Sequence, residues 1–132
     1  MNETVKTIEQ FHGHVGPYVI IGYKMGKIAN DRLGSDPFEK SVLVFTGTIP
    51  PISCIIDGIQ LSSGCTLGKG TIKVIGEQIP KAVFSNKKGE TITITLQEQV
   101  QQEIDATVTK QNMLKFSENL FNRLDTELFT IE

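Results

Sequence analysis

The stretch PYVIIGYKMGKIANDRLG, residues 17–34, predicts a helix with one apolar face. Pro17 suits the first helical position because its missing N–H needs no partner there, and Gly34 suits the end of the helix. The apolar face of this helix is formed by Val19, Ile20, Tyr23, Ile28 and Leu33. Gly22 and Gly26 lie four residues apart on it, so we expect another backbone to approach closely at these two positions.

Shorter segments on both sides of this helix show helical or strand patterns. Apolar residues at helical spacing predict a short helix around Val5, Ile8 and Phe11, a helix over residues 53–61, and one interrupted helix or two over residues 97–124. β-Branched and aromatic residues predict strands over residues 41–49, 71–75, 82–85, 91–96 and 128–131. Because no linker or repeat interrupts the chain, we expect one compact α+β domain, residues 1–132, with a mixed or antiparallel sheet flanked by helices.

The composition argues against several classes of function. Thirteen basic and 15 acidic residues are mixed along the chain and give a net charge of −2, so no basic surface is expected for a nucleic-acid backbone. No apolar stretch approaches the roughly 20 residues that cross a bilayer. The first ten residues, MNETVKTIEQ, lack the basic and apolar regions of a secretory signal. We therefore expect a soluble cytoplasmic protein with reduced cysteines and with no nucleic-acid or membrane partner.

The two histidines of the chain, His12 and His14, flank Gly13 shortly before the helix that begins at Pro17. Their rings can converge on one ion if the backbone turns, and they point apart if it is extended. The nearby helix amino terminus favours an anion, a carboxylate or a thiolate. An interpretation as two loop histidines that act as cap and hydrogen-bond partners explains the pattern equally well.

A second polar group lies on the helix predicted over residues 53–61. Cys54, Asp57 and Gln60 are three residues apart and share one face. A buried carboxylate there needs solvent, a cation or a histidine whose tautomer it fixes. A capping or surface aspartate is the simpler alternative. Cys65 follows in a glycine-rich loop whose free amides favour a thiolate, although a single cysteine more often only fills space in the core.

The loop GCTLGKG, residues 64–70, does not match a nucleotide-binding P-loop. Gly64 and Gly68 enclose three residues instead of four, and Gly70 follows Lys69 where a serine or threonine would bind magnesium. Only a weak interpretation of Lys69 as a phosphate contact remains. A serine hydrolase is also poorly supported, because the G-x-S-x-G pattern occurs nowhere in the chain.

Two long motifs of this chain are similar to those of a known family. Residues 11–26, FHGHVGPYVIIGYKMG, resemble the pattern FHGH-x-CPG-x-x-x-G-x-x-x-G, and residues 54–69 resemble C-x-x-DAIQ followed by TGCT-x-GK. Both patterns belong to the formylmethanofuran dehydrogenase E-subunit family, and the ending Glu127-Leu128-Phe129 resembles the close of its core domain. Two departures stand out. Gly16 replaces the family's cysteine, and the sequence ends where many relatives continue into a four-cysteine zinc ribbon.

The resemblance implies an α+β core that pairs as a homodimer and gathers its histidines and cysteines in a pocket able to take a metal. We expect His14, Cys54 and Cys65 to hold the ion, a three-ligand set that leaves one position open as catalytic zinc sites do. Imidazole and thiolate ligands favour zinc, iron or copper over magnesium or calcium, and zinc is the first choice. The expected catalytic groups, which orient a ligand or move a proton, are His12, Asp57 and Lys69.

Two classes of function follow from these residues. The first is an enzyme or enzyme subunit in one-carbon metabolism, associated with the molybdenum or tungsten enzyme that reduces carbon dioxide onto methanofuran. The second is a non-catalytic metal-binding accessory or carrier module, which the missing thiol at Gly16 favours. In both, the small-molecule ligand is left open by the sequence. We expect a homodimer to bury either the Gly22 and Gly26 face or the stripe of Phe116, Leu120 and Phe121.

Overall fold

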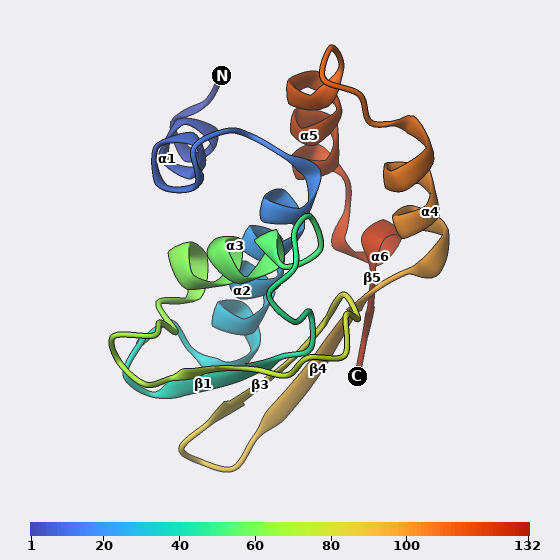
Figure 1. Cartoon of the computed structure of the whole chain (residues 1–132). Helices are drawn as coiled ribbons and strands as arrows, with labels where there is room; N and C mark the ends of the chain where they lie inside the picture. Colours follow the sequence, from blue (N-terminus) through green and yellow to red (C-terminus); the bar gives the residue numbers. More distant parts are fainter.

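The computed structural model describes residues 1–132 and places six helices and five strands in one α+β domain (Figure 1). The helices are α1 Glu3–His12, α2 Pro17–Leu33, α3 Cys54–Ser63, α4 Glu98–Thr107, α5 Met113–Asn122 and α6 Asp125–Leu128. The strands are β1 Lys40–Val44, β2 Ile72–Val74, β3 Lys81–Asn86, β4 Thr91–Leu96 and β5 Phe129–Ile131. The expected α+β class is confirmed.

The five strands form one mixed sheet in the order β2-β1-β3-β4-β5. β1 pairs in parallel with β2, and the other neighbouring strands are antiparallel. Buried and more exposed residues alternate along β1, β3 and β4, so one face of the sheet is turned to the core. The strand expected over residues 41–49 ends at Val44, because the chain then turns away and the Gly47 amide bonds to the Ile75 carbonyl.

Helices α2 and α3 pack against each other with their backbones in close contact. A Cβ at Gly22 would collide with the carbonyl of Ile55, and a Cβ at Gly58 would collide with the carbonyl of Val19. Glycine is therefore required on both helices at this crossing, which confirms close backbone packing as the role of Gly22. A Cβ at Gly26 would first meet the side-chain Oγ of Ser62 and then the backbone nitrogen of Ser63, so this glycine also lies against α3. Because α3 covers this face within the chain, it is not open to a second chain, which corrects one of the two expected dimer surfaces.

Between β4 and β5 the chain forms three helices beside α2. The region expected to contain one helix or two forms α4 and α5, and the short α6 then leads into β5. Arg123 joins these helices, because its Nη1 and Nη2 atoms donate hydrogen bonds of 2.8 and 2.7 Å to the two carboxylate oxygens of Glu103. Figure 1 shows α1 on one side of the start of α2 and α4 with α5 on the other. The start of α2 thus lies between two groups of helices.

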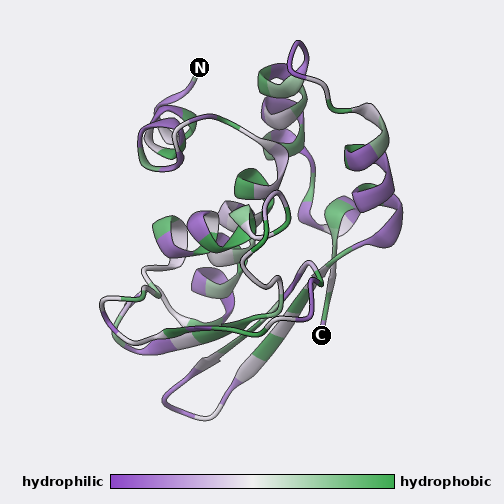
Figure 2. Ribbon diagram, in the orientation of Figure 1, coloured by the Kyte–Doolittle hydropathy of each residue, from purple (hydrophilic) through white to green (hydrophobic).

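Apolar residues are concentrated where the sheet faces α2 and α3, whereas α4 is largely polar (Figure 2). Of the residues of α4, only Val100 and Ile104 are buried. No helix of the chain combines the length and the apolar character needed to cross a membrane.

Candidate functional site

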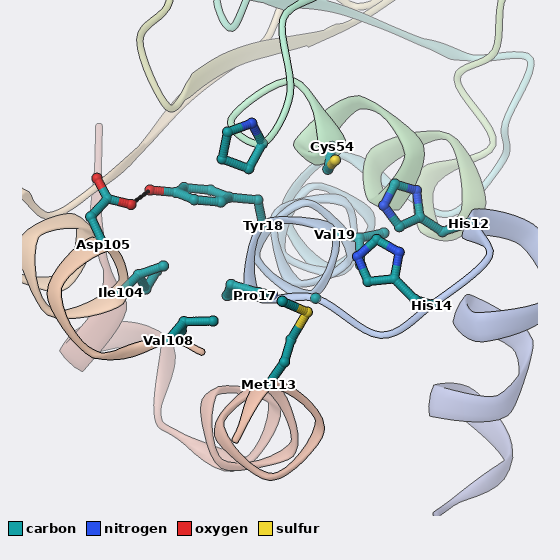
Figure 3. Close-up of a pocket in the computed structure, with 12 residues that line it drawn as sticks. His12, His14, Pro17, Tyr18, Val19, Cys54, Ile104, Asp105, Val108 and Met113 are labelled. Carbon is teal, nitrogen blue, oxygen red and sulfur yellow. Dashed lines mark hydrogen bonds between the residues drawn. The ribbon is translucent and has the colours of Figure 1, made fainter. Parts of the chain in front are cut away.

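A pocket of about 250 Å³ lies where the end of α1 and the starts of α2, α3 and α5 meet the end of α4 (Figure 3). Figure 3 shows three groups of lining residues: His12, His14 and Cys54 on one side, Ile104, Asp105 and Val108 on the other, and Pro17, Tyr18 and Met113 between them. The first turn of α2 therefore connects a side rich in nitrogen and sulfur to a side formed by α4.

His12 is held at this pocket by the carboxylate of Asp57. The helix α1 ends at His12 because Gly13 adopts a left-handed φ of 100°, and the ring Nδ1 then lies 2.6 Å from Asp57 Oδ2. The His12 side chain is 9% exposed and the Asp57 side chain 38%. When Nδ1–H donates its hydrogen bond to this carboxylate, Nε2 is the ring nitrogen that remains available to a ligand or a proton. The sequence suggested solvent, a cation or a histidine as the partner of the Asp57 carboxylate, and the structure shows a histidine.

His14 lies beside His12 on the loop that leads into α2. The two ring centroids are 4.9 Å apart and the ring planes are inclined by 40°. The backbone turn at Gly13 thus brings the rings together, as in the first of the two alternatives for these histidines. Gly16 adjoins the same ring, since a Cβ at that position would lie 3.1 Å from His14 Nε2. Position 16 therefore faces the pocket.

Cys54 is the first residue of α3 and lines the pocket while partly buried. Burial raises the pKa of the Cys54 thiol, and the nearby negative charge of Asp57 raises this pKa further. The thiol therefore stays protonated at neutral pH until a metal or another electrophile displaces the proton.

Two of the residues expected in the site lie elsewhere. Cys65 is fully buried in the hydrophobic core, where its backbone N–H donates a 3.1 Å hydrogen bond to Ser63 Oγ. Cys54 begins α3 and Cys65 follows its end, so a helix about 15 Å long separates them. Lys69 is not among the lining residues, and its Nζ lies 5.4 Å from the ring centroid of Phe38. This separation corrects the expected grouping of Cys65 and Lys69 with the pocket.

The donors at the pocket fit a transition metal in type, but they are not assembled around a common point. Two imidazoles and a thiol are ligands that zinc prefers. As the side chains stand, no three His, Cys, Asp or Glu residues of the chain are grouped closely enough to hold an ion. A side chain must therefore rotate if these residues are to share one ion.

The side of the pocket formed by α4 contains a polar pair that the sequence did not reveal. The hydroxyl of Tyr18 donates a 2.7 Å hydrogen bond to Asp105 Oδ1. Burial raises the pKa of Tyr18, and the hydrogen bond to Asp105 and its charge raise this pKa further, so the hydroxyl remains a neutral donor. The two residues are 87 positions apart in the chain, and no spacing pattern connects them.

Comparisons with known proteins agree with this fold. The family described as "FmdE, Molybdenum formylmethanofuran dehydrogenase operon" has a model that matches residues 11–130. The chain belongs to the FmdE family. The matched range contains both motifs of the sequence and all of the residues that line the pocket. The resemblance noted in the sequence is thus confirmed.

Two proteins similar to this FmdE-family chain place it among longer relatives. The crystal structure of a tungsten formylmethanofuran dehydrogenase FmdE-like protein from Syntrophus aciditrophicus has a TM-score of 0.74 and 22% identity, and the match covers 98% of this chain and 69% of that chain. A "Probable S-adenosyl-L-methionine-binding protein" of Archaeoglobus fulgidus is 33% identical over 69 residues, which cover 48% of this chain and 18% of that protein. The first comparison shows a shared fold, and in the second the chain spans less than a fifth of the relative.

Proposed function

We propose that this FmdE-family chain binds one transition metal ion in the pocket through His12, His14 and Cys54, and that zinc is the preferred metal. The observation that carries the proposal is the contact between His12 and Asp57. Metal-ligating histidines commonly donate their second ring N–H to a carboxylate, which fixes the tautomer and makes the other nitrogen a better ligand. Asp57 stands in that position toward His12 at 2.6 Å.

The proposed ligand set differs from the one expected from the sequence by the exchange of Cys65 for His12. His14 and Cys54 keep their roles because both line the pocket. Asp57 becomes a positioning residue that acts through His12, and Lys69 has no part in the proposal because it lies outside the pocket.

An enzymatic role is favoured over a carrier role because a set of three protein ligands would leave one coordination position for water or a substrate. An ion in such a site supplies Lewis acidity or an activated water. The chain's own contributions would be an oriented His12, a Tyr18 hydroxyl that holds the Asp105 carboxylate at the pocket, and an apolar wall at Val108 and Met113.

The name of the archaeal relative suggests S-adenosylmethionine as a ligand, but the structure of this chain argues against it. The pocket of about 250 Å³ is smaller than the roughly 300 to 1,000 Å³ of sites that enclose drug-sized ligands. The aligned part also covers 18% of that protein, so its binding site can lie in the remainder. A smaller ligand fits this pocket better.

Association with other chains belongs to the proposal as well. The family description names the molybdenum formylmethanofuran dehydrogenase operon, and we propose a molybdenum or tungsten enzyme of that kind as partner.

A homodimer stays a prediction. Leu120 is buried within the chain, so the stripe that remains for pairing consists of the partly exposed Phe116 and Phe121. Light scattering should give the dimer mass, and Phe116→Glu should shift it toward the monomer; a monomer at all concentrations contradicts pairing.

Zinc titration of matched cysteine variants tests the proposed ligands. The parent should bind about one zinc per chain, and Cys54→Ser should weaken the affinity at least tenfold. Cys65→Ser is the control, because it removes the same thiol from a position outside the pocket, and it should bind zinc like the parent once circular dichroism shows that it is folded. Failure of the parent to bind zinc or iron, or an equal loss in both variants, would contradict the proposal.

A further inference from the structure

We propose that the pocket takes a small amine, whose ammonium group binds the carboxylate of Asp105 while its hydrocarbon body lies along the wall formed by α4 and α5. The inference rests on the proposed function only for the opposite end of the ligand, which faces His14 and Cys54. Binding of the amine itself requires Asp105 and the apolar wall.

The charge of the lining residues favours a cation. The pocket is lined by no lysine and no arginine, and its two histidines lie on the side opposite Asp105, so a phosphate or carboxylate finds no basic side chain at the Asp105 end. Asp105 contributes a carboxylate to the lining. It takes part in none of the five ion pairs of the chain. Its hydrogen-bond partner is the neutral hydroxyl of Tyr18, which leaves its negative charge without a cation.

Tyr18 also fixes where this charge is presented. The tyrosine is 3% exposed and starts from the first turn of α2, so its hydroxyl is a rigid donor. By bonding Oδ1 at 2.7 Å, it holds the carboxylate at the edge of the pocket and leaves Oδ2 for a second donor. Figure 3 shows the Tyr18 ring extending from α2 to Asp105, with Ile104 of α4 and Val108, which directly follows α4, nearby.

The remaining wall is suited to hydrocarbon. Ile104, Val108 and Met113 line the space between Asp105 and the side that contains the histidines. Together with the volume of about 250 Å³, this wall selects a short apolar body in place of a nucleotide or sugar phosphate. A ligand of this class has its cationic end at Asp105 and its other end directed to the imidazole and thiol groups.

The test uses butylamine, 1-butanol and butanoate, which share one hydrocarbon chain and differ in the charge of the end group. Binding to the full chain is followed at neutral pH by amide NMR shifts of the lining residues, once with a metal chelator and once with zinc. Asp105→Asn removes the charge and keeps an acceptor for Tyr18. Glu98→Gln is the matched control, because it removes a charge of the same sign from the first turn of the same helix, outside the pocket.

We expect butylamine to bind more tightly than butanol or butanoate, and Asp105→Asn to weaken its binding by about threefold, as for an ion pair with an exposed carboxylate. Glu98→Gln should leave the affinity unchanged. Butanoate binding as tightly as butylamine, or an unchanged affinity in Asp105→Asn, overturns the inference. The titrations with chelator and with zinc separate the two proposals. Amine binding that depends on Asp105, in a protein that takes up no zinc, supports this inference and contradicts the proposed metal site. Zinc binding without Asp105-dependent amine binding supports the metal site and contradicts this inference.

Discussion

The Nδ1 atom of His12 lies 2.6 Å from Oδ2 of Asp57, a contact that ties the end of α1 to the first turns of α3 across 45 positions of the sequence. It orients one imidazole at the pocket and sets which of its nitrogens stays free. The same carboxylate helps to keep the neighbouring Cys54 thiol protonated. Asp57 therefore influences two of the three proposed ligands without being one itself.

Removing the Asp57 carboxylate should release the His12 ring. In Asp57→Ala the neutral imidazole loses the acceptor that selects the Nδ1–H tautomer, and zinc affinity should fall roughly 10- to 100-fold. Asp57→Asn keeps an acceptor and should lose less. Nitrogen-15 NMR of the imidazole and zinc titration measure both effects, with the exposed Asp31→Ala as control. An unchanged tautomer in Asp57→Ala would show that the carboxylate does not set it.

The two cysteines should differ in reactivity. Because burial and Asp57 raise the pKa of the Cys54 thiol, its alkylation rate should rise with pH around a midpoint above the ordinary value of about 8.5. Asp57→Asn should move this midpoint down. Cys65 is fully buried and should react only when the protein unfolds. Mass spectrometry after iodoacetamide treatment at a series of pH values follows each residue, and equal rates at both cysteines in the folded protein would refute the assignment.

Gly16→Cys should place a third sulfur atom at the pocket, in addition to those of Cys54 and Met113. The φ of −119° at Gly16 is open to any residue, and the new Cβ would lie 3.1 Å from His14 Nε2, so the ring must shift by a few tenths of an ångström. At the amino terminus of α2 the thiol should titrate below the ordinary pKa of about 8.5. It should also add one sulfur to bound zinc. An ordinary pKa without a new metal–sulfur bond would mean that this loop does not serve the site.

Much of the fold could be predicted because its signals are local. Pro17 and Gly34 mark the ends of α2 as expected, and the strand predicted over residues 91–96 matches β4. The strand predicted over residues 41–49 was too long, because the β-branched run continues past the point where the chain leaves the sheet. α6 was not anticipated, since four residues carry no periodic pattern. Local propensity thus found the elements and misplaced several of their ends.

The glycines at the crossing of α2 and α3 should be intolerant of substitution. Gly22→Ala and Gly58→Ala each place a Cβ against backbone that cannot move aside, and each should cost about 3 kcal/mol or more of unfolding free energy. Gly68→Ala is the control, because nothing lies within 4 Å of its Cβ, and it should change stability by less than about 0.5 kcal/mol. Urea unfolding measures all three. Equal effects at Gly22 and Gly68 would contradict the close helix contact.

The candidate site was only partly predictable. His12, His14, Cys54 and Asp57 stood out because the chain has few such residues and they lie within two motifs. Helix length already argued against Cys54 and Cys65 on one ion, since ten residues of helix extend about 15 Å between them. Asp105 was missed because its partner Tyr18 is remote in sequence and looked like one more apolar residue of a helix. Pairs of this kind become visible only when the chain is folded.

X-ray absorption at the zinc edge tests the central claim most directly, because it counts the sulfur and nitrogen ligands of the bound ion. For the zinc-loaded parent we predict one sulfur at about 2.3 Å and two imidazole nitrogens at about 2.0 to 2.1 Å. The sulfur should disappear in Cys54→Ser and remain in Cys65→Ser. Two sulfurs in the parent, a sulfur that is lost in Cys65→Ser, or an ion bound by oxygen alone would contradict a site made of His12, His14 and Cys54.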